Sequence, residues 1–333
     1  IVRARMAEIE VEMRSFGALS AGLDHYALGR GHLALSEWDA AYRDLKAAEA
    51  AGVQEVGLQY ALGRVLGERY SRALQDARRG GDRGFFERRK RELDAEYLNP
   101  LLTYLSRSRG LKTVSPSYLE GLIDFYQGRH GAALLHAQFA RRSTPWLYEA
   151  AQLEGDVHMA QALQQRDHGD AAAAERSFAQ AVARYGEAAE IGRSDARLYA
   201  AMAEAWIRQE EMDMYRGRDP RPKMEQALAA ADRALAADPK DADAYVKKAF
   251  AYHFQARYAG NHEGAAEQIR SLLDLQIRSG ELATEIDGRS ASAMEMIGTG
   301  YSALAEYGIR HGEQPTAMAQ KACAHPEKSL APS

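Results

Sequence analysis

The sequence predicts an all-helical protein in which antiparallel helix pairs stack on one another. Alanine, Leu, Glu, Arg and Gln dominate almost every stretch of the 333 residues, and the alternating Val, Ile and Thr typical of strands are nearly absent. Glycines also recur at a fixed interval, since Gly63 follows Gly29 by 34 residues and Gly155 follows Gly121 by the same 34. Packed helices approach closely only where one of them offers a small residue, so this spacing indicates a repeated helical array.

The composition limits the class of protein and its partners. With 46% hydrophobic and 27% charged residues, the chain is expected to fold. Its formal net charge of −4 provides no global positive field, so nucleic acid and anionic lipid are not expected as partners. The single cysteine, Cys323, can form neither an internal disulfide nor a cysteine-rich metal site, which fits a reducing, cytoplasmic location. No apolar run approaches the roughly 20 residues that cross a bilayer, so no membrane segment is expected within the chain.

The first expected element is a leading helix within residues 1–21. Met6, Ile9, Met13 and Phe16 recur at steps of three and four residues, which places them on one helical face. Such a stripe needs a partner, and we expect it to pack on the first repeat.

The repeats that follow share one pattern of small residues. In SPSYLEGLIDFYQGRHGAALLHAQFARRSTP, Ala133, Ala140 and Pro145 follow Gly121 by 12, 19 and 24 positions. These intervals and the 34-residue period resemble the tetratricopeptide repeat. The resemblance implies an α-solenoid of antiparallel helix pairs wound into a right-handed superhelix, here with irregular, extended repeats. The residues expected to pack the repeats are Gly29, Ala41, Ala48, Gly63, Gly121, Ala133, Ala140, Pro145, Gly155, Ala203, Ala227, Ala234 and Pro239.

Turn signals divide the chain into units. The predicted helix N-caps are Ser115, Thr144, Ser194 and Asp241, with Pro145 opening a helix after Thr144. A long charged helix is inserted within 76–112, and Pro100 is expected to kink or end it. The expected repeat region is 22–333, with units near 22–53, 56–112, 114–145, 146–192, 194–239, 241–280 and 290–325, and a tail at 326–333.

Five segments carry a narrower resemblance. In this order, HYALGRGHLALSEWDAA, YALGRVLGERY, SPSYLEGLIDFY, PWLYEAAQLEGD and IGRSDARLY resemble the repeat region that follows the catalytic domain of some bacterial serine/threonine protein kinases, over most of residues 18–260. The resemblance implies a regulatory or recruiting arm in signalling. The phosphate-covering glycine loop, His-Arg-Asp and Asp-Phe-Gly motifs are missing from the sequence, and Asp124-Phe125-Tyr126 lacks the glycine. We therefore expect no enzyme activity in this chain, and any kinase domain would lie upstream of Ile1.

The sequence offers only weak candidates for catalytic and metal-binding residues. Glu154 and Asp156 flank Gly155 and, as helical positions about 200° apart, cannot readily converge on one substrate. Trp146 and Tyr148 are expected in the core or a groove rather than as a nucleotide-stacking platform. Neither candidate ligand cluster has the paired spacing of a zinc site, so no metal or other cofactor is expected; the two clusters are His311 with Cys323 and His325, and Asp156 with His158.

The remaining candidates are binding residues. Stacked helix pairs leave a groove lined by the first helix of each unit, which suits a peptide or partner protein, including the chain's own kinase domain. Asn99 and Asn261 do not fall at the positions that clamp a terminal carboxylate in the co-chaperone branch of the family. The expected groove residues are Tyr26, Arg30, Tyr118, Leu122, Phe125, Tyr126, Gln152, Asp156 and Tyr199; a possible electrostatic patch is Arg88, Arg89, Lys90 and Arg91. Acidic neighbours make ion pairs along that helix the main alternative for the patch. The function expected is a protein-binding scaffold, with a stand-alone adaptor or sensor in a bacterial signalling or defence complex as the alternative to a kinase arm.

Overall fold

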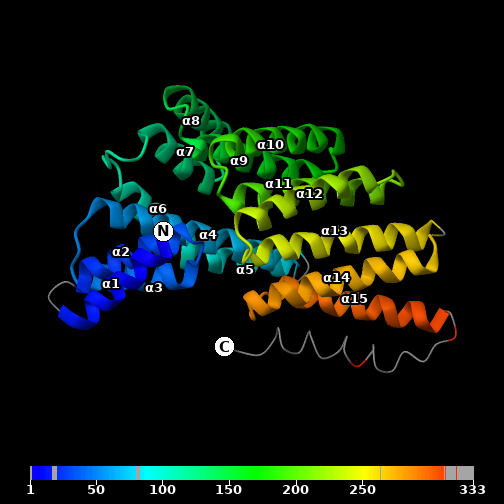
Figure 1. Cartoon of the computed structure of the whole chain (residues 1–333). Coiled ribbons are helices and arrows are strands. Elements are labelled where there is room, and N and C mark those ends of the chain that lie inside the picture. The colour runs from blue at the N-terminus through cyan, green and yellow to red at the C-terminus, as the bar shows by residue number, and fades with distance from the viewer. Residues whose placement is uncertain are drawn as a thin grey trace. The chain divides into compact units, whose positions relative to one another are not determined.

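The computed structural model describes residues 2–16, 21–79, 83–262 and 264–310, together with 312 and 320. Over these residues the chain is helical and contains no strand, which confirms the all-helical prediction. The helices form two compact units, unit 1 (Ile1–Ala140) and unit 2 (Arg141–Ser333), and each is described by itself. Figure 1 shows the order of the helices along the chain.

Unit 1 contains the leading helix and the first helix pairs. Its elements are α1 (Val2–Phe16), α2 (Ala21–Ala34), α3 (Trp38–Ala50), α4 (Val56–Arg79), α5 (Arg83–Leu93), the π-helical turn η2 (Asp94–Leu98), α6 (Asn99–Arg107), α7 (Pro116–Tyr126) and α8 (His130–Ser143), whose last residues enter unit 2. Helix α2 packs on α3, and α4 packs on α6.

Unit 2 is a series of long helices, each packed on the next. They are α9 (Tyr148–Asp167), α10 (Ala171–Ile191), α11 (Ala196–Tyr215), α12 (Arg221–Ala237), α13 (Ala242–Asn261), α14 (Ala266–Ile286) and α15 (Ala291–Arg310). Helices α13, α14 and α15 lie side by side in Figure 1. No helix of the described residues is both long enough and apolar enough to span a membrane.

Helix α1 places its apolar stripe on α2. Met6 and Ile9 are buried and pack with Leu28, and Met13 is partly buried against the same cluster. Gly31 allows this approach, because a Cβ atom there would lie 2.6 Å from Met6 Sδ. The side chain of Phe16 lies outside the described residues.

The recurring glycines have a common packing role. A Cβ atom on Gly29 would lie 2.6 Å from Leu45 Cγ, one on Gly63 would lie 2.6 Å from Leu105 Cδ2, and one on Gly155 would lie 2.5 Å from Tyr185 Cε1. In each case a glycine of the first helix receives a large side chain from the second helix of its own pair. This contact explains the 34-residue interval between Gly29 and Gly63. The predicted fold class, a tetratricopeptide-like α-solenoid of helix pairs, is confirmed.

The other small residues of the pattern divide into two groups. Glycines and alanines of the predicted packing set are buried in helices, whereas Pro145 and Pro239 are exposed in the turns between helices. The buried members are Gly29, Ala41, Ala48, Gly63, Gly121, Ala133, Ala140, Gly155, Ala203, Ala227 and Ala234. Proline has no backbone N–H and ends helices, so its place in the pattern reflects chain reversal rather than packing.

Two of the four predicted N-caps are correct. The Ser115 hydroxyl accepts a hydrogen bond from Tyr118 N, and the Asp241 carboxylate accepts from Ala244 N at 3.2 Å. Thr144 is not a cap, because a turn closed by Leu147 N donating to Thr144 O at 2.9 Å delays the start of α9 to Tyr148. Pro145 therefore lies in that turn and does not open the helix.

Ser194 is also wrong as a cap, by one residue. A turn from Gly192 to Asp195 places Asp195 at the N-cap, where its carboxylate accepts from Arg197 N at 3.1 Å. Pro100 does not end the inserted helix either: it lies in the first turn of α6, and the chain stays helical from Arg83 to Arg107. The π-helical turn directly before α6 is a distortion of the kind by which helices absorb a local misfit.

Candidate partner-binding site

The candidate site of unit 1 starts from a pair of residues that recurs with the repeat. Tyr26 and Arg30 lie one turn apart on α2, and Tyr60 and Arg64 lie one turn apart on α4, 34 residues later. Residues four apart share a helical face, so each arginine can lie over its tyrosine. The Arg30 guanidinium is 5.6 Å from the Tyr26 ring centroid, and the Arg64 guanidinium is 6.0 Å from the Tyr60 ring centroid. The first helices of two successive pairs, α2 and α4, therefore present an arginine beside a tyrosine in the same way.

Glycines of α4 bring the neighbouring first helices close. A Cβ atom on Gly57 would lie 2.2 Å from Tyr26 Oη of α2, and one on Gly67 would lie 2.1 Å from Tyr126 Oη of α7. Only a residue without a side chain admits the two phenol groups at these distances. Helices α2, α4 and α7 thus form one continuous surface, with tyrosines at both of its junctions.

Arg64 lies at the centre of this surface. Its Nη1 donates to Tyr60 Oη at 3.1 Å and to Tyr118 Oη at 3.1 Å, and the Arg64 side chain is partly exposed. Both acceptors are uncharged hydroxyls. Within the described part of the chain, no carboxylate forms an ion pair with this guanidinium.

The electrostatics keep Arg64 charged. Burial lowers the pKa of the guanidinium, but the neighbouring Tyr118, Tyr60 and Glu68 raise it, and the net pKa lies well above the ordinary value. Arginine keeps its charge even when desolvated. The site therefore holds a permanent positive charge that tyrosine hydroxyls orient and that no ion pair neutralises within the described residues.

The predicted groove residues occupy different environments. Tyr26, Arg30 and Tyr126 lie on the surface just described, whereas Tyr118 and Leu122 are buried, with 3% and 6% of their surface exposed. Phe125 is partly buried and meets the Tyr126 ring edge to face at 5.4 Å. Tyr118 contributes its hydroxyl to Arg64 from within the core.

Sequence reasoning missed Tyr60 and Arg64. The signal was present, because each lies 34 residues after a residue that had been selected, Tyr26 and Arg30. Applying the period to the groove positions as well as to the packing glycines would have found both.

Gln152, Asp156 and Tyr199 belong to unit 2. Asp156 accepts a hydrogen bond from Tyr185 Oη at 2.9 Å, and Tyr199 Oη donates to Arg193 O at 3.3 Å. Glu154 is buried and accepts from Arg141 Nε at 2.5 Å. Glu154 and Asp156 thus engage different partners on different helices and do not form a pair.

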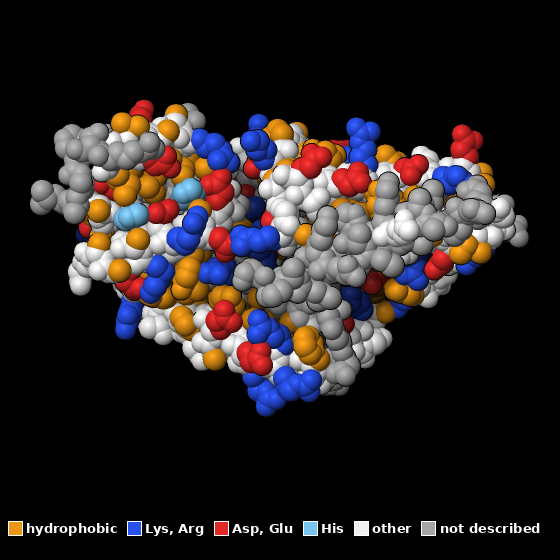
Figure 2. Space-filling view, turned by 90° about the horizontal axis from the view of Figure 1, so that it is seen from below, with side chains coloured by type: hydrophobic (Ala, Val, Ile, Leu, Met, Phe, Trp, Pro, Cys, Tyr) orange, Lys and Arg blue, Asp and Glu red, His pale blue; other side chains and the backbone are white. Residues whose placement is uncertain are grey.

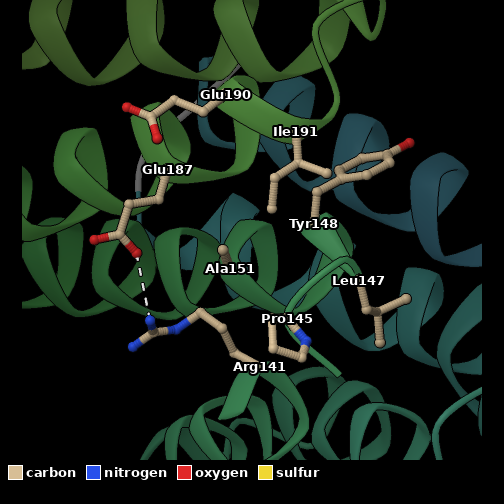
Figure 3. A pocket seen from close by; sticks show the side chains of 8 residues that line it. All are labelled: Arg141, Pro145, Leu147, Tyr148, Ala151, Glu187, Glu190 and Ile191. Carbon is tan, nitrogen blue, oxygen red and sulfur yellow. Dashed lines mark ion pairs between the residues drawn. The ribbon is translucent and has the colours of Figure 1, made fainter. Parts of the chain in front are cut away.

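Unit 2 also contains a hollow of about 350 Å³ (Figure 3). The arginine beside it is already engaged, since Arg141 binds Glu154 and lies 3.5 Å from a carboxylate oxygen of Glu187. Tyr148 donates to Asp195 at 3.2 Å, and burial, together with the charges of Asp195 and Glu149, raises its pKa to about 12. The hollow therefore offers a neutralised arginine, in contrast to Arg64. Its lining residues are Arg141, Pro145, Leu147, Tyr148, Ala151, Glu187, Glu190 and Ile191.

Trp146 and Tyr148, both expected in the core or a groove, lie in different environments. The Trp146 side chain is 74% exposed, so it is not a core residue, whereas Tyr148 is partly buried and packs with Ala151 and Leu198. The turn at 144–147 that delays α9 is what leaves Trp146 exposed.

The basic stretch of α5 forms the expected ion pairs along its own helix. Arg89 Nη1 lies 2.7 Å from Glu92, and Lys90 Nζ lies 2.6 Å from Asp94. Arg88 and Arg91 are exposed. As for metal ligands, no group of three or more His, Cys, Asp or Glu side chains that could hold an ion occurs among the described residues, and His311, Cys323 and His325 lie outside them.

The fold defines the class of protein: a solenoid of tetratricopeptide-like helix pairs. No protein-family model matches the chain, and no curated protein matches it. Among solved structures, MamA is 17% identical with a TM-score of 0.42, covering 63% of this chain and 92% of its own. The Cut9–Hcn1 hetero-tetramer of APC/C is 12% identical with a TM-score of 0.47. The match covers 89% of this chain and 45% of the other.

A human IFIT1 dimer with PPP-AAAA is 10% identical with a TM-score of 0.47, covering 99% of this chain and 68% of its own. At these TM-scores and identities, none of the three similarities carries an argument about function.

Proposed function

We propose that this chain is a non-catalytic scaffold that binds a protein or peptide partner. The binding surface is the one that helices α2, α4 and α7 form in unit 1. The observation that carries the proposal is the pair of Tyr–Arg contacts on α2 and α4, joined to α7 by the hydrogen bond from Arg64 to Tyr118. Tyrosine and arginine are the residue types on which binding energy concentrates in protein interfaces. Helix-pair solenoids use such surfaces to hold extended segments.

Gln152, Asp156 and Tyr199 are proposed as contacts of unit 2 for a partner of the same kind, and Arg88 to Arg91 as an accessory electrostatic contact. We further propose that the chain is the regulatory or recruiting region of a bacterial serine/threonine kinase. The order of the five repeat segments supports this assignment. A stand-alone adaptor in a signalling or defence complex is the alternative.

Peptide selection tests the scaffold proposal. Peptides from a phage-displayed library are selected on the immobilised chain, and their affinities are compared for the wild type, a Tyr60→Ala/Tyr126→Ala double variant and Tyr215→Ala. Tyr215 is 67% exposed at the end of α11 and is the matched control. The double variant should lose at least about tenfold in affinity while the control binds normally, because interface tyrosines contribute strongly. Failure to select any peptide, or equal affinity of all three proteins, would reject the site.

The kinase assignment has a separate test. The gene is read upstream of the Ile1 codon, where a glycine loop followed by His-Arg-Asp would support a kinase arm and a nearby start codon would favour the adaptor. Incubation of the purified chain with ATP and generic protein substrates tests the non-catalytic assignment, which turnover would overturn.

A further inference from the structure

We propose that Arg64 binds an anionic side chain, a carboxylate or a phosphate, in the middle of an extended peptide segment of the partner. This inference rests on the proposed function and names the chemistry that the site of unit 1 recognises. It depends on which donors of the guanidinium are already used.

Among the described residues, one nitrogen of Arg64 is engaged in hydrogen bonds. Both hydrogen bonds, to Tyr60 and to Tyr118, come from Nη1. Nε and Nη2 make no hydrogen bond within the described residues, and neither is among the buried polar atoms without a partner, so each keeps some solvent-accessible surface. The Nε–Nη2 edge is one that binds a carboxylate or phosphate with two parallel hydrogen bonds.

The two tyrosines fix the direction of that edge. With its Nη1 hydrogens directed at two hydroxyls, the guanidinium plane cannot rotate freely. A guanidinium held in this way loses little conformational entropy on binding, which favours specific recognition of an anion.

Two other partly buried arginines, Arg141 and Arg208, lack this property. Arg141 binds Glu154, and Arg208 binds Glu204 at 2.8 Å and Glu211 at 3.3 Å. Their charges are compensated within the fold. Arg64 differs from these two because both of its hydrogen-bond acceptors are hydroxyls.

The surroundings favour one anionic group over a polyanion. The negative charge of Glu68 raises the pKa of Arg64, and that of Glu55 raises the pKa of Tyr26, so carboxylates lie close to the site. Figure 2, which views the molecule from one side, shows the same mixture of Lys and Arg with Asp and Glu on that face of the molecule as a whole. The phosphates of a nucleic acid backbone would meet these carboxylates along with Arg64, whereas a peptide with one acidic residue would not.

Arrays of random twelve-residue peptides test the inference. The peptides carry an amidated C-terminus, which removes the terminal carboxylate, and a fixed central residue that is Glu, Gln, phosphoserine or Ser. Binding is measured for the full chain as wild type, Arg64→Gln, Arg64→Lys and Arg43→Gln. Arg43 is exposed on α3, so its variant makes the same charge change away from the site.

The wild type and Arg43→Gln should prefer Glu over Gln, or phosphoserine over Ser, by roughly tenfold, as expected for a charge-assisted hydrogen bond. Whichever pair shows the preference identifies a carboxylate or a phosphate. Arg64→Gln should lose the preference, and Arg64→Lys should retain only part of it because lysine lacks the planar fork.

A second readout uses only the wild type and so does not depend on the variants folding. Phenylglyoxal modifies accessible arginines, and the best anionic peptide should slow modification of Arg64, but not of Arg43, as measured by mass spectrometry. Peptides that bind without preference for the anion, or that leave Arg64 unprotected, would overturn this inference while leaving the proposed surface intact. Absence of all peptide binding would overturn both, as would binding of a single-stranded RNA oligonucleotide, and not of peptides, that is lost in Arg64→Gln.

Discussion

Glu210 of α11 carries a fully buried carboxyl group. Neither of its oxygens has a hydrogen-bond partner among the described residues, and burial raises its pKa to about 9. The side chain is therefore protonated at neutral pH in the folded protein. In the unfolded chain, a glutamate with its ordinary pKa of 4.5 is ionised at the same pH.

This difference fixes the sign of a pH dependence. Below about pH 4.5 the carboxyl group is protonated in both the folded and the unfolded chain, so its titration does not change the free energy of unfolding. Between pH 4.5 and 9 only the folded state binds the proton, so the free energy of unfolding falls as the pH rises through this window. Above about pH 9 the carboxyl group is ionised in both states, and the free energy of unfolding falls no further on account of Glu210.

We predict that Glu210→Gln removes this loss, because glutamine imitates the protonated acid and does not titrate. Relative to the wild type, the variant should gain on the order of 2–3 kcal/mol in free energy of unfolding between pH 5 and pH 7, an upper limit for a shift of this size. Urea unfolding at both pH values measures it. Glu225→Gln, an exposed change on α12, is the control and should show no such gain. A constant difference between Glu210→Gln and the wild type across the window would contradict the prediction.

At the scale of the element, the two glycines of the α9–α10 pair have opposite environments. Gly155 on α9 receives the ring of Tyr185, which also donates a hydrogen bond to Asp156 at 2.9 Å and so cannot readily move away. Gly186, the residue after Tyr185 on α10, has no atom within 4 Å of an added Cβ. The same substitution should therefore change the stability in opposite directions.

Gly155→Ala should lower the free energy of unfolding by about 1–3 kcal/mol, the usual cost of overpacking a tight contact. Gly186→Ala should raise it by up to about 1 kcal/mol, because alanine favours the helix over glycine. Thermal unfolding followed by circular dichroism measures both. If Gly155→Ala were as stable as Gly186→Ala, the packing role assigned to the 34-residue period would be wrong.

The helix pairs could be predicted from the sequence because one contact repeats in them. A glycine facing a large side chain, as Gly29 faces Leu45, recurs at a fixed interval and leaves a periodic signal. The start of α9 left no such signal, because Thr144 and Pro145 read as a helix start, and only the backbone shows that a turn continues to Leu147. Local sequence does not distinguish a proline in the first turn from one in the preceding turn.

The candidate site was only partly predictable for a related reason. The period locates Tyr60 and Arg64, but the role of Arg64 depends on a hydroxyl from Tyr118, 54 residues away on α7. That this arginine has hydroxyl acceptors, while Arg141 has carboxylate acceptors, depends on how neighbouring helices meet. The period of the sequence does not show which side chains of neighbouring helices come into contact.

For the whole molecule, the main consequence of the fold is that contacts are made between neighbours. The core is divided into local clusters: Leu45 packs with Leu58 and Leu62 in unit 1, whereas Leu198 packs with Ala151 and Ala188 in unit 2. In such an array, stability is roughly a sum of local terms and terms between neighbouring repeats. A defect in one cluster should therefore loosen its own helices without loosening distant ones.

Hydrogen exchange on a pair of matched variants tests this locality. Leu45 and Leu198 are both fully buried, and replacing either by alanine should cost about 2–5 kcal/mol of local stability. Leu45→Ala should speed amide exchange in α2 to α4 and leave α11 to α14 unchanged, because the latter share no cluster with Leu45. Leu198→Ala should speed exchange in α9 to α11 and leave α2 to α4 unchanged. Mass spectrometry of peptic fragments resolves these segments, and a uniform acceleration along the whole chain by either variant would mean that the two units unfold as one cooperative body.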